Sequence, residues 1–220
     1  MDSRLNTAAA RRPSPVTRSK GLRPCYLPLV LLLALGGGAL QQPVTDPLLP
    51  GSWEERQQQL GQLHSWKLAG RIAVQLDKDA GSATLQWHQQ RDNYVIRLIG
   101  PLGKGNIELQ GSPGGVSMRD SDNRLQFARD PESLLEAQFG WQVPLSGLHW
   151  WIRGLPDPAE KIDSLQLDEQ ASIAELSQAG WQVSYGRYRL QQGLRLPEKI
   201  HLSNAHLKVK LQIRKWELLP

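Results

Sequence analysis

From Trp66 onward, apolar residues fall at every second position in one segment after another, and this alternation constrains the fold more than any other feature. Successive side chains of a β-strand point to opposite faces, so a period of two predicts strands with one buried and one wet face. Turn-forming residues separate the segments and favour short hairpin connections. The sequence therefore predicts an antiparallel meander, with strands over residues 66–76, 83–87, 94–98, 107–109, 116–118 and 125–127 and turns at 79–81, 91–93, 112–115 and 120–123.

Three helices are predicted from the residues that mark their ends. Ser52 and Glu55 have the spacing of a capping box, which predicts a helix that ends near residue 64. An Asp-Pro pair at the start and a glycine at the end predict a second helix within 130–140. A short third helix is expected over 146–153, where a glycine and a proline follow it closely.

Strands resume after the helices, near Ser172, at 181–185, at 199–203 and at 207–217. In the last of them the apolar residues change parity between Ile213 and Trp216, which predicts a β-bulge near Arg214-Lys215. Strands, helices and strands thus follow one another in groups, which is typical of an α+β fold. We expect a curved antiparallel sheet, a half-open barrel of about nine to eleven strands, covered by about three helices.

The first 38 residues have the pattern of an export signal, because basic residues precede the apolar run Tyr26–Leu35 and small residues follow it. The run has ten residues, whereas a transmembrane helix needs roughly 20. Cys25, the single cysteine, precedes the run, so we expect the exported part to contain no disulfide. Gly38 stands where a bacterial lipoprotein precursor would carry its lipid-modified cysteine, so no lipidation site is predicted. The predicted organisation is a targeting segment (1–38), a linker (39–51) and a single domain (52–220).

The charge balance argues against a nucleic-acid partner. The chain has 26 basic and 21 acidic residues, and six of the basic and one of the acidic residues lie within 1–38. The remainder has 20 of each and no net charge. Binding to a phosphate backbone is driven largely by a basic excess, which this domain lacks.

Residue patterns for catalysis or metal binding are weak. The five histidines are scattered and show neither an HExxH motif nor paired zinc-ligand spacing, so we predict no metal site. Gly103-Lys104-Gly105 lacks the spacing of a phosphate-binding loop, and residues 120–123 depart from a calcium loop. We predict no cofactor and no catalytic residue. A serine–histidine hydrolase stays open, because such a pair need not be adjacent in the sequence.

Tryptophan is unusually frequent, with eight residues between Trp53 and Trp216 against two phenylalanines in the chain. Large aromatic side chains mostly fill cores, and this is the simplest interpretation of each one alone. The pair Trp150-Trp151 would present a wide apolar face on a helix, since neighbouring helical residues point about 100° apart. We interpret this as a sign of an apolar, ligand-sized pocket without catalytic groups.

Several short motifs, in this order, resemble the LolB family of outer-membrane lipoprotein receptors over roughly residues 52–218. The motifs are WKLAGRIAV (66–74), LQWHQ (85–89), GPLG (100–103), PLSGLHWW (144–151), GLP (154–156) and GWQVSY (180–185). The resemblance implies an open, curved antiparallel sheet with a helical cover around a hydrophobic cavity. It also implies a function without enzymatic activity, in which lipoproteins are accepted from the periplasmic carrier LolA and placed in the outer membrane of a Gram-negative bacterium.

The alternation and the resemblance together give a predicted site. The predicted cavity residues for acyl chains are Ile72, Val74, Leu85, Trp87, Ile96, Leu98, Trp150, Trp151, Trp181 and Tyr185. A protruding loop with Pro101, Leu102 and Gly103 is expected to engage the membrane. The expected partners are LolA, triacylated lipoproteins and outer-membrane lipids, and the expected state is a monomer at the periplasmic face of that membrane. A periplasmic carrier of another lipid is the main alternative, and Gly38 favours it because such a carrier needs no anchor.

Overall fold

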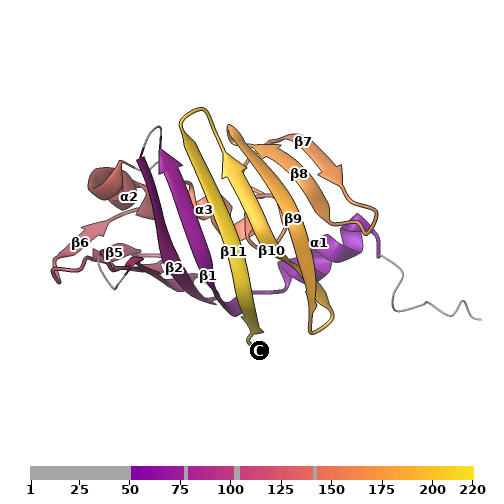
Figure 1. Cartoon of the computed structure of the whole chain (residues 1–220). Coiled ribbons are helices and arrows are strands. Elements are labelled where there is room, and N and C mark those ends of the chain that lie inside the picture. The colour runs from indigo at the N-terminus through magenta and orange to yellow at the C-terminus, as the bar shows by residue number, and fades with distance from the viewer. Residues whose placement is uncertain (1–50, 77–78, 102–104, 141–142) are drawn as a thin grey trace, which may run out of the picture. The chain divides into compact units, whose positions relative to one another are not determined.

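The computed structural model describes residues 51–76, 79–101, 105–140 and 143–220, and the strands in these ranges form one antiparallel sheet (Figure 1). The strands are β1 (Ser65–Leu76), β2 (Asp79–Gln90), β3 (Asn93–Ile99), β4 (Ile107–Ser112), β5 (Gly115–Arg119), β6 (Leu125–Ala128), β7 (Ile162–Leu167), β8 (Ile173–Gln178), β9 (Trp181–Gln191), β10 (Leu194–Ser203) and β11 (Leu207–Leu218). Their order across the sheet is β6-β5-β4-β3-β2-β1-β11-β10-β9-β8-β7, with β6 and β7 at the two edges. The predicted meander is confirmed, and β1 and β11 join its two halves in the middle of the sheet.

Three helices lie in the described ranges, and the predicted caps of the first two are confirmed, although the first helix ends at Gly61 and not near residue 64. They are α1 (Trp53–Gly61), α2 (Pro131–Phe139) and α3 (Leu145–Trp151). The capping box of α1 is present, since the Ser52 hydroxyl accepts from the Glu55 amide and the Glu55 carboxylate accepts from the Ser52 amide. Asp130 accepts from the amide of Ser133, and Gly140 ends α2 with a φ of 68°. None of the described helices is long and apolar enough to cross a membrane.

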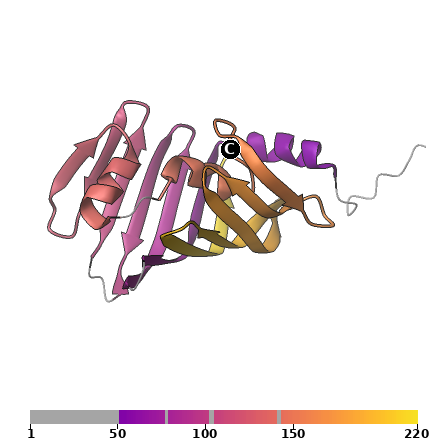
Figure 2. The same cartoon turned by 90° about the horizontal axis from the view of Figure 1, so that it is seen from above.

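The core lies on one side of the sheet, where α2 and α3 cover it (Figures 1 and 2). In β1 the buried and exposed side chains alternate, and Trp66, Leu68, Ile72 and Val74 point into the core. Leu134 and Leu135 of α2 and Leu148 and Trp151 of α3 belong to the same buried cluster. The alternation in the sequence therefore marks the covered face of the sheet.

The predicted bulge is confirmed in β11. Ala69 pairs with Lys215 and Gly70 with Ile213, so Arg214 is the extra residue on β11. Gly70 lies very close to β11, because a Cβ at this position would be 2.3 Å from the backbone oxygen of Gln212. Only a glycine leaves space for this contact, and the bulge increases the local bend of the sheet.

Two predictions about strands were wrong. Residues 79–81 form the start of β2 and not a turn, because Asp79 pairs with Leu76 and the ladder with β1 overrides the turn-forming composition. Strand β7 was not predicted, because its side chains are mostly exposed on both faces and show no alternation. In addition, β10 begins at Leu194, earlier than predicted, and α3 spans 145–151 where 146–153 was expected.

Candidate functional site

A small apolar cavity lies between the sheet and its helical cover. Its volume is about 40 Å³, enough for about three water molecules. Its lining residues come from β1 to β4, α2, α3 and the segment before α3, and none of them is polar. They are Ile72, Val74, Leu85, Trp87, Ile96, Leu98, Leu109, Leu135, Val143, Leu145 and Leu148.

Six of the ten predicted cavity residues lie around this cavity, and all six are strand residues. They are Ile72, Val74, Leu85, Trp87, Ile96 and Leu98. Sequence reasoning missed the remaining lining residues. Leu109 continues the same alternation on β4, and the spacing of Leu145 and Leu148 places them on one face of α3, so these three had a usable signal. Leu135 and Val143 had no comparable signal, because which helical residues approach the sheet depends on how the helices dock.

Trp151, Trp181 and Tyr185, which were also predicted to line the cavity, lie together on the other half of the sheet. The Trp151 ring centroid is 6.4 Å from that of Trp181, and the Tyr185 hydroxyl donates to the Trp151 backbone oxygen at 2.8 Å. The Trp151 indole N–H donates to the Gln178 side-chain oxygen at 2.9 Å. Because Gln178 lies on β8 and Tyr185 on β9, these contacts fasten the end of α3 to the sheet.

Trp150, the tenth predicted residue, is partly buried beside Arg153. The Arg153 guanidinium lies 4.5 Å from the Trp150 ring centroid and donates to the backbone oxygens of Leu63, at 3.0 Å, and His149, at 3.2 Å. Burial lowers the pKa of Arg153 to about 10, so the side chain stays charged at neutral pH. This buried cation links the end of α3 to the segment that follows α1.

An aromatic cluster surrounds Trp66, near the start of β1. The Trp66 ring centroid lies 5.3 Å from those of Trp87 and Trp216 and 6.3 Å from that of His149. Burial, with smaller effects from the charges of Arg153 and His64, lowers the pKa of His149 to about 4. At neutral pH the imidazole is therefore uncharged, which suits its aromatic surroundings.

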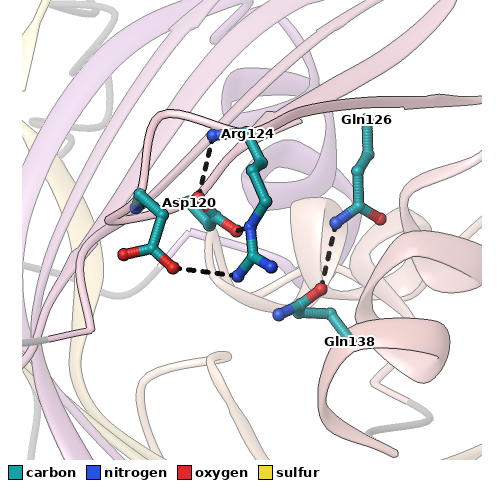
Figure 3. Close-up of polar contacts among 5 residues, drawn as sticks. Asp120, Arg124, Gln126 and Gln138 are labelled. Carbon is teal, nitrogen blue, oxygen red and sulfur yellow. Dashed lines mark hydrogen bonds and ion pairs between the residues drawn. The ribbon is translucent and has the colours of Figure 1, made fainter.

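A side-chain hydrogen bond joins α2 to the edge of the sheet. The Gln126 amide on β6 donates to the Gln138 side-chain oxygen on α2 at 3.0 Å, as Figure 3 shows. The same figure shows the predicted turn before β6, which is confirmed: Asp120 accepts from the backbone amide of Arg124 at 3.0 Å and from its guanidinium at 2.8 Å. The Gln126–Gln138 contact is exposed and contributes little to the docking of α2.

The cavity is small in this structure. Pockets that hold small molecules have volumes of about 300–1,000 Å³, roughly ten times the volume found here. A space of this size cannot hold an acyl chain unless it widens. The lining carries no nucleophile or base, and among the described residues no group of three or more histidine, cysteine, aspartate or glutamate side chains could hold a metal ion.

Parts of the predicted membrane-engaging loop and the predicted processing site lie outside the described residues. Leu102 and Gly103 belong to the range 102–104, and Gly38 belongs to 1–50. Pro101, the third residue of the predicted loop, is exposed and follows the end of β3 closely.

Comparisons with known proteins agree with this geometry. The family model described as "Outer membrane lipoprotein LolB" matches residues 64–216. An outer-membrane lipoprotein LolB of Pseudomonas fluorescens is 42% identical over 188 residues, which cover 86% of this chain and 91% of the relative. A second one, from Pseudomonas putida, is 40% identical over 198 residues, which cover 89% and 96%.

Solved structures agree with the fold. A LolA superfamily protein of Nitrosomonas europaea superimposes with a TM-score of 0.52 at 9% identity, covering 77% of this chain and 94% of that one. A putative outer membrane lipoprotein-sorting protein domain of Vibrio parahaemolyticus gives 0.53 at 5% identity, covering 75% and 89%. At these identities the structures support the fold alone, whereas the match over residues 64–216 and the close relatives establish the family. The chain belongs to the LolB family of outer-membrane lipoproteins.

Proposed function

We propose that this protein accepts triacylated lipoproteins from the periplasmic carrier LolA and inserts them into the outer membrane from its periplasmic face. The observation that carries the proposal is the wholly apolar cavity beneath α2 and α3, in a chain about 40% identical to outer-membrane lipoproteins of the LolB family. Exposing one C16 acyl chain to water costs on the order of 12 kcal/mol, at about 0.8 kcal/mol per methylene. A triacylated protein therefore needs such a shelter on its way between membranes.

The chemistry of the lining suits transfer as well as holding. All lining residues are apolar, so the cavity offers an acyl chain burial without a directional contact that would fix it in place. Transfer without a chemical energy source has to proceed from weaker to stronger binding, in the order carrier, receptor and bilayer. A receptor that recognises chains by burial alone can release them to a bilayer, which buries them without having to open a cover.

Opening of the cover is the step that controls entry. The cavity holds about 40 Å³, and the contacts of α2 with the sheet include its buried leucines and an exposed hydrogen bond, Gln126–Gln138. We infer that acyl chains take the place of the apolar face of α2, which moves outward as the chains enter. The ligand then stabilises an open state that the empty protein populates rarely.

Delivery requires contact with the membrane, and we propose that the loop of Pro101, Leu102 and Gly103 provides it. Inserting one leucine into the interface contributes roughly 1.5–3 kcal/mol, enough for a brief encounter but too little for stable anchoring. Because Gly38 cannot carry a lipid, we propose that the protein attaches loosely to the outer membrane or stays free in the periplasm.

A transfer experiment tests the proposed function. LolA loaded with a triacylated lipoprotein is mixed with the full chain, and the complex is isolated and weighed by native mass spectrometry, which also gives the state of assembly. We expect the lipoprotein to move to a monomer of this protein and then into added liposomes. Bound free lipid would instead support a carrier of another lipid, and turnover of an ester substrate would support a hydrolase. If the lipoprotein stays on LolA, the proposed function is wrong.

A further inference from the structure

A second hollow, with a volume of about 360 Å³, adjoins the apolar cavity. It lies where the inner faces of β2 to β5 meet the first turns of α2 and α3. Trp87 and Leu145 line both spaces, so the hollow and the apolar cavity lie side by side against these two residues. Unlike the cavity, the hollow has polar and charged groups in its wall. We call it the polar vestibule, and the residues that matter here are Trp87, Arg91, Asp92, Tyr94, Arg129 and His149.

Two polar side chains flank the shared tryptophan in the wall of the vestibule. The ring centroids of Tyr94 and His149 lie 6.4 and 6.5 Å from that of Trp87. Within the described part of the chain, neither the Tyr94 hydroxyl nor the His149 imidazole has a hydrogen-bond partner. By contrast, the indole N–H of Trp87 is satisfied by the side-chain oxygen of Gln89 at 2.9 Å. The two free groups are thus available to a ligand at the end of the apolar cavity.

Both free groups are uncharged at neutral pH. Burial, together with the nearby carboxylates of Glu132 and Asp130, raises the pKa of Tyr94 to about 12. Burial lowers the pKa of His149 to about 4. The phenol therefore donates a hydrogen bond, and the neutral imidazole donates one and accepts another.

The charges around the vestibule nearly cancel. Arg91 and Arg129 in its wall are opposed by Asp92. The carboxylate of Glu132 lies directly behind the wall, since it accepts from the amide and the hydroxyl of Ser146, both at 3.0 Å. A phosphate would be repelled by these carboxylates, and the surrounding charges include no excess of cations to offset the repulsion. An uncharged polar group is not repelled in this way.

We propose that the polar vestibule binds the uncharged head of an acylated cysteine, with its ester and amide carbonyls, while the attached acyl chains occupy the apolar cavity. The inference rests on the proposed function and deepens it, because it assigns a place to the part of the ligand that joins the chains to the protein. The hydroxyl of Tyr94 and the imidazole of His149 donate to carbonyl oxygens, and Trp87 marks the boundary between head and chains. The site thereby distinguishes an acylated cysteine from a phospholipid that has the same chains.

A pair of synthetic ligands tests this proposal on the unmodified full chain. One is a triacylated cysteinyl peptide, and the other is its analogue in which ether links replace the two esters, so that the chains are the same but the ester carbonyls are missing. Two hydrogen bonds of about 1 kcal/mol each predict about 30-fold tighter binding of the ester peptide. A phospholipid with the same chains should bind more weakly than the ester peptide.

Two double variants test whether Tyr94 and His149 cause the preference for the ester peptide. Tyr94→Phe combined with His149→Phe leaves an aromatic ring at each position and removes both hydrogen-bond donors. We therefore expect the preference for the ester peptide to disappear, while the ether analogue binds as before. Tyr188→Phe combined with His201→Phe is the matched control, since Tyr188 lies outside the vestibule and donates to the Ile173 backbone oxygen, and His201 is exposed. This control should keep the preference, and thermal unfolding checks the fold of each variant.

The outcomes separate this inference from the proposed function. If the unmodified protein binds both peptides equally, or binds the phospholipid more tightly, the vestibule does not recognise the head, although acyl chains still bind. The inference also fails if the folded Tyr94/His149 variant retains the full preference. If neither peptide binds at all, the proposed function itself is wrong, and the inference falls with it.

Discussion

Leu134 offers a test of whether α2 must move before acyl chains can enter. This side chain is 4% exposed and belongs to the core, but it does not line the apolar cavity. Leu134→Ala therefore weakens the docking of α2 and leaves the binding surface intact. Substitution of a buried leucine by alanine costs about 2–5 kcal/mol. We expect about 2 kcal/mol here, because a nine-residue helix with an exposed outer face can settle into the space that is left.

The expected effect on binding follows from this loss. The apparent affinity of a ligand that binds only the open state is proportional to the fraction of open molecules. If the substitution destabilises the closed state by about 2 kcal/mol, the open fraction rises by up to roughly 30-fold. A triacylated peptide should then bind up to about 30-fold more tightly, although the variant unfolds at a lower temperature. Gain of affinity with loss of stability is the signature of a cover that competes with the ligand.

The assay combines thermal unfolding with titration of the triacylated peptide. Leu176→Ala is the matched control, because Leu176 is fully buried on β8 and does not line the cavity. It should lower the melting temperature without changing the dissociation constant. If Leu134→Ala leaves the affinity unchanged or lowers it in protein that is still folded, the outward movement of α2 is not part of the mechanism.

Three further predictions concern the anchor, the loop and the aromatic cluster. Gly38→Cys should allow labelling by a fatty-acid analogue, and label on the unchanged chain would refute our interpretation of residue 38. Leu102→Glu should spare folding and uptake from LolA but slow delivery to liposomes; delivery at the unchanged rate would rule out a role for Leu102 at the membrane. His149, with a pKa of about 4 in the folded protein and about 6.5 unfolded, contributes stability that is present above pH 6.5 and is lost as the pH falls toward 4. The loss should amount to about 3 kcal/mol in denaturant titrations, and a pH dependence that persists in His149→Phe would show that another group causes it.

The sequence predicted the sheet well wherever one face of a strand is buried. In β1 and β11 the alternation specified both the strands and their inner faces, and the change of parity located the bulge at Arg214. The prediction failed where neither face of a strand is buried. Edge strand β7 is exposed on both faces and left no pattern, and the start of β2 is a strand only because β1 pairs with it.

The site could be predicted only in part. Residues that the strands place on the inner face were found from parity, but parity cannot tell which half of a long sheet a cavity occupies. For this reason Trp87 was placed correctly beside the space, whereas Trp181, on an equally buried strand, lies in another part of the core. The lining from α2 and the small volume of the cavity depend on how tightly the cover docks, and this is set by tertiary packing.

The small volume of the cavity gives a physical reason for the proposed direction of transfer. In the empty protein the apolar face of α2 already covers the sheet, so little apolar surface is left in contact with water. An incoming acyl chain gains the burial of its own methylenes but has to displace this face, and the net affinity is lower by the free energy of closure. A bilayer imposes no such cost, because its interior is already open to a chain. The proposed mechanism therefore predicts that this protein binds each chain more weakly than the membrane does, and that the cover which opposes entry also favours release.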